Sequence, residues 1–473
     1  MLTIKTRFAP SPTGDLHIGG LRTALYNYLF AKKNNGKFVL RIEDTDRARF
    51  KKGSVETILT GLKWVGIKTD GKIIYQSLRT DIYKKYAEQL IVKNKAYYCF
   101  CSAEILNKIR EEQIKNGNPA KYDRRCLKLS KKEIEEKIKN NDPYVVRLII
   151  PDGKTKFKDL IREEVEFNNR EIDDQVLLKS DGYPTYHLAN VVDDHKMKIS
   201  HVIRAEEWLS STPKHIILYE YFGWKPPKFA HIPMVLASDK SKLSKRHGAT
   251  GVLEFKKQGY LPEAIINFLA FLGWNPGDSR EIFSMQELIK EFSIEKVQKG
   301  GAIFNIEKLN WINGQYIRKL NIDKLTKLCI SYFEKKKSLH SSLFIKQIVA
   351  LEQNRLKKLS DIAEFSDFFF KNKLEYDKDL LKWKNMNNEE LKNILEKISD
   401  IFSEIPENDF TKEKLEPILK SEAVKIGDNG KVFWPLRVAL SGKKASPGPM
   451  EIAEILGKEK SVERVKSALE KIK

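Results

Sequence analysis

The stretch that decides the fold is Arg7-Phe8-Ala9-Pro10-Ser11-Pro12-Thr13-Gly14-Asp15-Leu16-His17-Ile18-Gly19-Gly20. Residues 3–9 are expected to form a short strand, the two prolines to interrupt regular structure, and an apolar helical pattern to begin at Leu21. A helix N-terminus carries unpaired N–H groups and a partial positive charge, so it suits a phosphate group. Glycines at such a turn let a nucleotide approach the backbone closely. The pattern predicts a strand–turn–helix unit with a phosphate site, although residues 17–20 alone fit an ordinary α/β turn equally well.

The composition indicates a multidomain globular protein with an excess of positive charge. The 473 residues are too many for one compact core. Lys and Arg number 86 against 64 for Asp and Glu, which gives a formal net charge of +22. Such an excess suits a polyanionic partner such as nucleic acid, while a Lys-rich codon bias is the alternative explanation.

The cellular compartment is predicted from what the chain lacks. No apolar window is long enough to cross a bilayer, and the N-terminus shows no secretion pattern. Four cysteines in so long a chain indicate a reducing compartment rather than a disulfide scaffold. We therefore expect a cytoplasmic protein without membrane attachment.

Alternating strand and helix patterns predict a doubly wound parallel sheet. A buried strand at residues 38–42 ends in acidic residues beginning at Glu43, and such residues face the ligand crevice of α/β folds. From residue 97 the regular alternation of strand and helix patterns ends. A helix is expected at 102–116, a capping box at Ser130 and Glu133, and strands at 144–150 and 175–179. Further strands are predicted at 202–208 and 232–236, with a helix at 213–222 between them.

A basic loop, Lys242-Leu243-Ser244-Lys245-Arg246-His247-Gly248, lies between a strand and a helix. Lysines so placed could close over polyphosphate and stabilise its charge, although a solvated basic loop is the alternative. After Trp274 the chain reads as almost entirely helical. Helical periodicity covers residues 285–292, 306–312, 324–335, 343–351, 357–370, 389–402 and 412–422.

Three separated stretches resemble conserved blocks of the bacterial-type glutamyl-tRNA synthetases, a class I family. Residues 7–20 resemble its ATP-binding signature, with Gly20 where class I enzymes in general carry His. Residues 242–248 resemble the second class I signature, with Leu243 for the usual Met, and residues 434–442 resemble the last block. The resemblance spans essentially the whole chain.

The resemblance implies an α/β fold: a doubly wound Rossmann-like catalytic domain with an α+β insertion, followed by an all-helical anticodon-binding region. We expect the two catalytic halves at 1–96 and 184–240 and an acceptor-end-binding insertion at 97–183. A signature-loop and stem-contact helical domain is expected at 241–317, followed by the anticodon-binding region at 318–473.

The implied activity is that of a glutamate–tRNA ligase. The α-carboxylate of L-glutamate attacks the α-phosphate of ATP, bound with Mg²⁺, and the adenylate then passes its glutamyl group to the 3′-terminal adenosine of tRNA(Glu). Charging of tRNA(Gln) is left open, as is a requirement for tRNA in glutamate activation, and a monomer is expected. No enzyme nucleophile is needed, which fits a sequence without a convincing nucleophile–base set.

Matching positions imply the site residues. His17 and Lys245 are the predicted catalytic residues: His17 donates to a phosphate or ribose oxygen, and Lys245 stabilises the pentacoordinate phosphate. The predicted ATP-binding residues are Thr13, His17, Gly19, Gly20, Lys242, Ser244 and Lys245. The predicted glutamate-binding residues are Arg7, Ala9, Ser11, Glu43, Tyr186, Asn190 and Arg204.

Among these, Arg7 would grip the side-chain carboxylate and Glu43 the ammonium group. For Tyr186 and Asn190 a helix-surface pair four residues apart is the alternative. His201 and His215 are expected to be structural. Arg355 matches an anticodon-reading position, with a solvated helix end as the alternative.

Cys99, Cys101 and Cys126 match three positions that bind zinc in some relatives. Lys128 occupies the fourth position and is a poor ligand when protonated, so the prediction favours three metal-free reduced thiols. Asp123, Glu104 or water could complete a zinc site instead.

Three other functions are alternatives to this ligase activity. A glutaminyl-tRNA synthetase has a strand-rich anticodon region, and a truncated glutamyl-transfer enzyme would lack the helical region, so neither fits. A catalytically dead, basic tRNA-binding protein with a nucleotide-binding fold is the remaining alternative.

Overall fold

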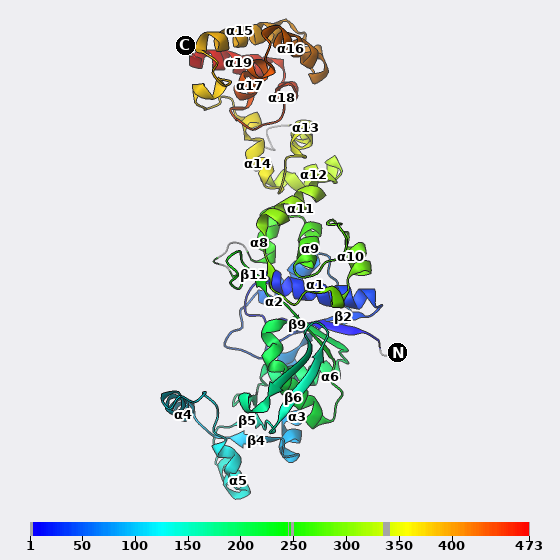
Figure 1. The fold of residues 1–473 in the computed structure, drawn as a ribbon, viewed down its shortest axis with the longest axis vertical. Helices are drawn as coiled ribbons and strands as arrows, with labels where there is room; N and C mark the ends of the chain where they lie inside the picture. Colours follow the sequence, from blue (N-terminus) through cyan, green and yellow to red (C-terminus); the bar gives the residue numbers. More distant parts are fainter. Residues whose placement is uncertain (1–2, 245, 247–249, 334–340, 473) are drawn as a thin grey trace. The chain divides into compact units, whose positions relative to one another are not determined.

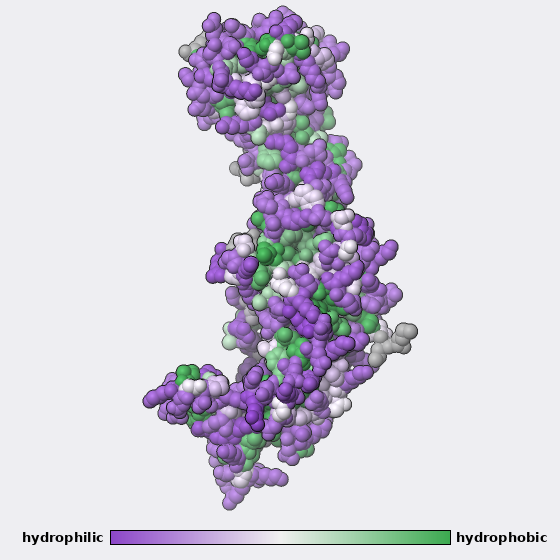
Figure 2. Space-filling model, viewed as in Figure 1, coloured by the Kyte–Doolittle hydropathy of each residue, from purple (hydrophilic) through white to green (hydrophobic). Residues whose placement is uncertain are grey.

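The structure, a computed structural model, describes residues 3–244, 246, 250–333 and 341–472. The chain forms two units: Met1–Lys257 with Pro262–Leu309, and Gln258–Leu261 with Asn310–Lys473. Among the described residues, no helix combines the length and the apolar character needed to cross a membrane. The face seen in Figure 2 is dominated by hydrophilic side chains, with apolar ones in small patches.

Parallel strands form the centre of the first unit, as predicted. Strand β1 (Lys5–Phe8) pairs with β2 (Lys37–Ile42), which pairs with β3 (Ile74–Tyr75). A second sheet has the order β7-β6-β10-β9, and Ser200, just before β9, donates its amide to Lys5 O at 3.0 Å. Its strands are β6 (Lys154–Asp159), β7 (Glu163–Asn168), β9 (His201–Ala205) and β10 (Lys228–Ile232).

Helix α1 (Ile18–Lys33) connects the central strands to a helical layer. It packs on β1, β2 and β9, and also contacts α9 (Pro262–Phe271) and α10 (Met285–Glu291) (Figure 1). The other helices of this unit include α2 (Ser54–Trp64), α3 (Thr80–Val92), α6 (Tyr186–Lys196), α7 (Thr212–Phe222) and α8 (Val252–Lys257). Among them, α3 and α6 contact β8, and α7 contacts β6. Helices therefore cover the sheet as a doubly wound fold requires.

The predicted insertion contains a small antiparallel sheet of its own. This sheet has the order β4-β5-β8, from Ala96–Cys99, Val145–Leu148 and Val176–Leu178. Helices α4 (Ala103–Lys115) and α5 (Lys131–Lys139) lie beside it in Figure 1, and the predicted capping box of Ser130 and Glu133 is confirmed. The β6–β7 hairpin from the same stretch pairs instead with β10 of the larger sheet.

The second unit is helical, as predicted. A long helix, α15 (Asn388–Glu404), packs against α19 (Lys458–Ile472) and α17 (Asn429–Ser441) and contributes buried residues to the core. Helix α11 (Ile306–Arg318) contributes residues to both units. The remaining helices are α12 (Ile322–Cys329), α13 (Ser342–Glu352), α14 (Asp361–Phe365), α16 (Lys412–Ile426) and α18 (Pro449–Leu456).

Several predicted elements were wrong in extent; the helix expected at 324–335, for example, ends at Cys329, and residues 334 and 335 lie outside the described part of the chain. The strand expected at 202–208 ends at Ala205, and Glu206–Ser211 forms a 3-10 helix. The Glu206 carboxylate in this helix accepts a hydrogen bond from the Met234 amide. The strand expected at 232–236 is divided at Pro233 into β10 and β11 (Val235–Leu236), which pairs with β12 (Ala302–Ile303), because proline cannot donate to a ladder. The helix expected at 357–370 begins only at Asp361, whose carboxylate accepts the amides of Lys357 and Lys358.

Candidate active site

His17 stands at the turn between β1 and α1. It is the N-cap of α1, and its Nδ1 accepts the amide N–H of Gly20 at 3.3 Å. Desolvation and the nearby Lys242 ammonium lower the pKa of His17, so the imidazole is neutral at pH 7. Because Nδ1 accepts, the proton is on Nε2, which can donate to a phosphate or ribose oxygen.

Gly19 and Gly20 fit this turn sterically. A Cβ on Gly19 would approach the His17 ring atoms to 3.2 Å, and one on Gly20 would approach Leu16 Cδ1 to the same distance. Larger residues would therefore displace the capping imidazole or its neighbour. Thr13 and Ser11 lie in the exposed loop before it, where the Thr13 amide donates to Ser11 O at 2.9 Å.

The segment just after the second signature pairs with the end of the first. Ile18 donates its amide to Thr250 O at 2.9 Å, and Val252 donates to Leu16 O at 2.9 Å. The Lys242 ammonium lies 2.5 Å from Glu207 Oε2, and Ser244 is exposed. Lys245, His247 and Gly248 lie outside the described residues, so the predicted role of Lys245 stays a prediction.

Strand register places two buried arginines on one face of the sheet. Arg7 on β1 pairs with Val39 on β2, and Arg41 stands two residues beyond Val39, so both side chains point the same way. Helix α6 covers this face. It presents Tyr186, Asn190 and Asp194, which are four residues apart and share one side of the helix.

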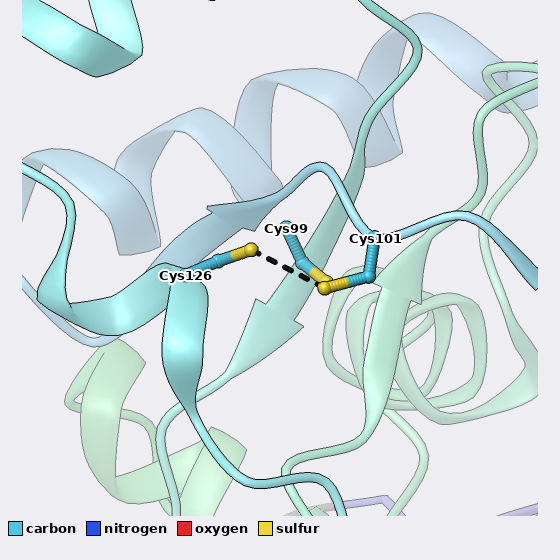
Figure 3. Close-up of side chains that lie close together, drawn as sticks. All are labelled: Cys99, Cys101 and Cys126. Atoms are coloured by element: carbon cyan, nitrogen blue, oxygen red, sulfur yellow. Dashed lines mark hydrogen bonds between the residues drawn. The ribbon is translucent and has the colours of Figure 1, made fainter. Parts of the chain in front are cut away.

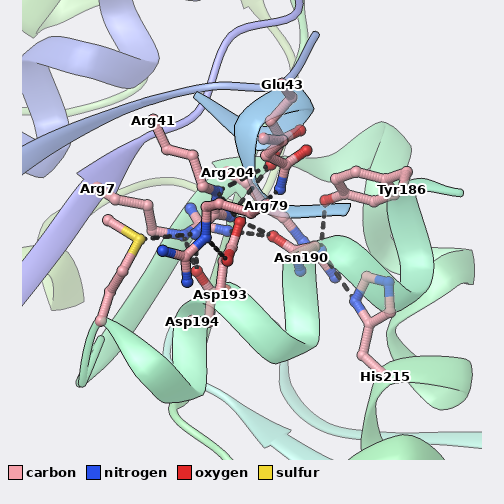
Figure 4. A network of polar contacts seen from close by, with 12 residues as sticks. Arg7, Arg41, Glu43, Arg79, Tyr186, Asn190, Asp193, Asp194, Arg204 and His215 are labelled. Carbon is pink, nitrogen blue, oxygen red and sulfur yellow. Dashed lines mark hydrogen bonds and ion pairs between the residues drawn. The ribbon is translucent and has the colours of Figure 1, made fainter. Parts of the chain in front are cut away.

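These side chains form a buried network of ion pairs (Figure 4). The Asp194 carboxylate forms ion pairs with Arg7, through Nε at 3.1 Å, and with Arg41, through Nη1 at 2.7 Å. Arg41 Nη2 in turn lies 3.1 Å from Glu43 Oε1. Asp193, on the same helix, receives Arg79 Nε at 2.9 Å. Three guanidinium groups therefore face three carboxylates, and the network is close to neutral.

Burial and charge act in opposite directions on these acids. Burial opposes the ionisation of Asp194, but Arg7 and Arg41 lower its pKa below the ordinary value. Burial raises the pKa of Glu43, and Arg41 and Arg7 moderate that rise. Asp194 is therefore held as a carboxylate between its two arginines.

Several polar atoms of the network have no partner among the described residues. Arg41 uses only Oε1 of Glu43, which leaves Oε2 as an acceptor for an ammonium group. Asn190 Oδ1 accepts from Arg7 and Arg41, which leaves its amide N–H groups, and Arg7 Nη1 also remains. Together these atoms offer one anionic acceptor and several donors, as an α-amino acid with a second carboxylate requires.

Arg204, on β9, differs from the other arginines of the site. It makes no ion pair within the part of the chain that the structure describes. All its hydrogen-bond partners are neutral, so its positive charge is not compensated by direct contact. These partners are Tyr186 Oη at 2.9 Å, Thr212 Oγ1 at 2.8 Å, His231 Nε2 at 3.0 Å, His215 Nδ1 at 3.2 Å and Trp208 O at 3.3 Å.

The predicted glutamate-binding residues are thus largely brought together. Arg7, Glu43 and Asn190 share one hydrogen-bonded network. The Tyr186 hydroxyl oxygen accepts a hydrogen bond from Arg204, so its own proton remains available for donation to a substrate. Asn190 is 2% exposed, so the alternative of a helix-surface pair is wrong for it. Ala9 is half-buried and follows β1 directly.

Sequence reasoning missed Arg41, Asp193 and Asp194, and described His215 only as structural. Arg41 interrupts the apolar run of a strand, and the two aspartates follow apolar residues within a helix. A charge inside an apolar run needs a partner if the element is buried. That rule could have indicated the network, although not which partner each charge takes.

The predicted cysteine cluster is present (Figure 3). The sulfur atoms of Cys99, Cys101 and Cys126 lie within 4.8 Å of one another, and Cys101 Sγ is 3.5 Å from Cys126 Sγ. A tetrahedral zinc centre with Zn–S bonds of about 2.3 Å needs sulfur atoms about 3.8 Å apart, so the spacing fits zinc. Hydrogen bonds lower the pKa of Cys99 and favour its thiolate, and the hydrogen bond with Cys126 makes the largest contribution to this lowering.

The residues considered for the fourth ligand position do not complete the thiol cluster. Lys128 is exposed, Asp123 pairs with Arg125 at 2.8 Å, and neither Asp123 nor Glu104 joins the thiol cluster. The Tyr122 hydroxyl lies 3.3 Å from Cys99 Sγ and 3.4 Å from Cys101 Sγ. Burial and hydrogen bonds to the three thiols raise the pKa of Tyr122, so its hydroxyl keeps its proton and is a poor zinc ligand. Three thiols with a water molecule would make a zinc set, and the prediction of metal-free thiols stays untested.

Arg355, in the second unit, is anchored rather than fully solvated. Its Nη1 lies 2.5 Å from Glu352 Oε2, its Nη2 donates to Ala445 O at 3.1 Å, and its guanidinium lies over the Phe365 ring. Its side chain is 29% exposed. These contacts fix one edge of the guanidinium and leave part of it accessible.

Comparisons with known proteins agree with this arrangement. Residues 3–311 match the family "tRNA synthetases class I (E and Q), catalytic domain", and residues 324–469 match "Anticodon binding domain". The chain is 47% identical to glutamate–tRNA ligase 2 of Thermoanaerobacter pseudethanolicus, over 99% of this chain and 98% of that protein. It is 43% identical to the glutamate–tRNA ligase of Clostridioides difficile, over 98% of each chain.

A solved structure extends the agreement to the fold. The crystal structure of a glutamate tRNA ligase from Elizabethkingia meningosepticum, in complex with its amino acid, superposes with a TM-score of 0.90 at 37% identity, covering 100% of both chains. The α/β fold with a helical C-terminal region is thereby confirmed. The chain belongs to the glutamate–tRNA ligases of the class I tRNA synthetase family.

Proposed function

We propose that this protein activates L-glutamate with ATP and transfers the glutamyl group to the 3′-terminal adenosine of tRNA(Glu). The observation that supports this most is the division of charge in the site. Arg7 and Arg41 are neutralised by Asp194, whereas Arg204 has only neutral partners among the described residues. A site with one uncompensated guanidinium and a free Glu43 oxygen suits a dicarboxylic amino acid.

Roles for the amino-acid side follow from the unused atoms. Glu43 Oε2 would accept from the substrate ammonium. Arg204 and Arg7 Nη1 would converge on the side-chain carboxylate, with Tyr186 and Asn190 as further donors. A neutral amide in place of that carboxylate would leave a buried positive charge unpaired, which is costly. The pocket should therefore reject glutamine.

Roles for the ATP side rest on the two signatures. ATP would enter as its magnesium complex, as class I enzymes of this family use it. His17 Nε2–H would donate to a phosphate or ribose oxygen, and Lys242 and Lys245 would stabilise negative charge that develops on the phosphates. The enzyme then needs no nucleophile, because the substrate carboxylate attacks the α-phosphate and pyrophosphate leaves.

The test is charging of purified tRNA(Glu) and tRNA(Gln) with labelled glutamate. We expect label on tRNA(Glu), and loss of adenylate formation but retention of tRNA binding in Lys245→Ala. Label on both tRNAs would keep the ligase activity and widen its RNA specificity. RNA binding without any charging by the wild type would refute the proposal and support the catalytically dead RNA-binding protein.

We also propose that Arg355 contributes to tRNA choice. Its anchored guanidinium retains an accessible edge, and Glu352 and Phe365 restrict its orientation. Arg355→Ala should alter the ratio of tRNA(Glu) to tRNA(Gln) charging while leaving the KM for glutamate unchanged. An unchanged ratio would mean that Arg355 only stabilises the end of its helix and does not contribute to tRNA choice.

Light scattering of the purified protein would test the expected monomer.

A further inference from the structure

A buried Asp–His pair lies directly behind Arg204. In the parallel pairing of β9 and β10, Arg204 is opposite His231, so the two side chains share one face. Asp159 ends β6 and is paired with Phe229, two residues before His231. His231 Nδ1 lies 2.6 Å from Asp159 Oδ2, and Arg204 Nε donates to His231 Nε2 at 3.0 Å.

The protonation of this chain is fixed by its surroundings. Burial opposes ionisation of Asp159, but His231 and the amides of Arg162 and Ile161 lower its pKa, so it is a carboxylate. Burial lowers the pKa of His231 to about 4, so its ring is neutral at pH 7. A carboxylate can only accept, so His231 carries its proton on Nδ1 and presents a bare Nε2 to Arg204.

A neutral imidazole does something that a carboxylate could not do here. A carboxylate against Arg204 would pair with its charge, as Asp194 pairs with Arg7. The His231 ring accepts the Nε–H and leaves the positive charge for an anion. His215 is a second neutral ring beside this guanidinium, with its Nδ1 at hydrogen-bond distance from Arg204 Nη1. The Nε2 atom of His215 lies 3.1 Å from His187 Nδ1.

We propose that Asp159 and His231 are positioning residues for Arg204: Asp159 sets the imidazole tautomer, and His231 fixes the guanidinium toward the substrate carboxylate without neutralising it. This inference rests on the proposed function, in which Arg204 binds that carboxylate. Neither residue touches the substrate. Their effect should therefore appear in glutamate affinity rather than in ATP affinity.

The experiment compares His231→Leu, His231→Gln and the control His201→Leu. His201 begins the same strand as Arg204 and is 6% exposed, and its ring contacts Ser200 and the Phe30 ring. Loss of one hydrogen bond to a charged group should raise the KM for glutamate about 10-fold or more in His231→Leu. The KM for ATP and the unfolding midpoint should match those of His201→Leu.

His231→Gln supplies the rescue, because a primary amide offers a donor and an acceptor side by side, as the ring does. It should restore most of the glutamate affinity. Asp159→Asn is the second variant: its amide can donate to Nδ1, which moves the ring proton to Nε2. That proton then opposes the Arg204 Nε–H and can turn only to Thr212 Oγ1, 3.1 Å from Nε2, so the ring no longer accepts from Arg204. We expect it to raise the KM for glutamate as well.

The outcomes separate this inference from the proposed function. A wild-type protein that charges no tRNA with glutamate would refute the proposed function. A charging wild type with the same KM for glutamate in His231→Leu and His201→Leu would overturn only the positioning role. If His231→Leu does not fold, nitrogen-15 NMR of labelled histidine in the wild-type chain decides: an Nδ1–H tautomer of His231 supports the inference, and an Nε2–H tautomer refutes it.

Discussion

Asp194→Asn is the perturbation that probes the buried network most severely. Asp194 is 1% exposed and is shared by Arg7 and Arg41, whose side chains are 3% and 0% exposed. Asparagine keeps the shape of the side chain but removes its charge. Two buried guanidinium groups then lose their common counter-ion, and a buried charge without its partner is strongly destabilising.

The expected loss is about 3–5 kcal/mol in the free energy of unfolding, the usual cost of removing one partner of a buried pair. The assay is urea unfolding of the full chain, followed by tryptophan fluorescence. Asp46→Asn is the matched control, because Asp46 pairs with Arg49 at 2.6 Å on the surface and such pairs contribute about 1 kcal/mol or less. Equal shifts for the two variants would refute the reasoning.

Three further predictions concern separate sites. Glu43→Gln should raise the KM for glutamate about 10-fold or more, since it removes the charge next to the substrate ammonium; an unchanged KM in steady-state charging would contradict this role. Burial raises the pKa of Glu352 to about 7 despite Arg355, so the folded chain binds this proton more tightly than the unfolded one and loses stability as the pH rises through 7. Glu352→Gln should therefore unfold at higher urea concentration than wild type at pH 8, by up to about 3 kcal/mol, and the difference should vanish only near pH 4, below the ordinary pKa of a glutamate side chain. Metal analysis checks the prediction of metal-free thiols: we expect no stoichiometric zinc in wild type purified without chelator, and about one zinc per chain that is lost in Cys126→Ser would contradict it.

Local features of the fold were predictable from the sequence because they depend on neighbouring residues. The strand–turn–helix at residues 7–20 and the Ser130 capping box need only prolines, glycines and a cap in the right order. The single strand expected at 232–236 failed although its cause, Pro233, is visible in the sequence. Apolar residues on both sides of the proline hid the interruption.

The site was predictable only in part, since its chemistry depends on pairings across the sheet. Motif positions gave Arg7, Glu43 and Arg204, but not that Asp194 neutralises Arg7 while Arg204 stays unpaired among the described residues. That difference arises from the register of β9 against β10, which places His231 rather than a carboxylate opposite Arg204. No local pattern in the sequence encodes this register.

The central claim is that Arg204 provides the uncompensated charge that selects glutamate. Its most direct test is kcat/KM for glutamate and for glutamine in tRNA(Glu) charging, measured for wild type and Arg204→Gln. The account predicts a wild-type preference for glutamate of about 10⁴-fold, as sites with buried polar groups achieve, and loss of most of it in the folded variant. A folded Arg204→Gln enzyme that keeps the full preference would contradict the account.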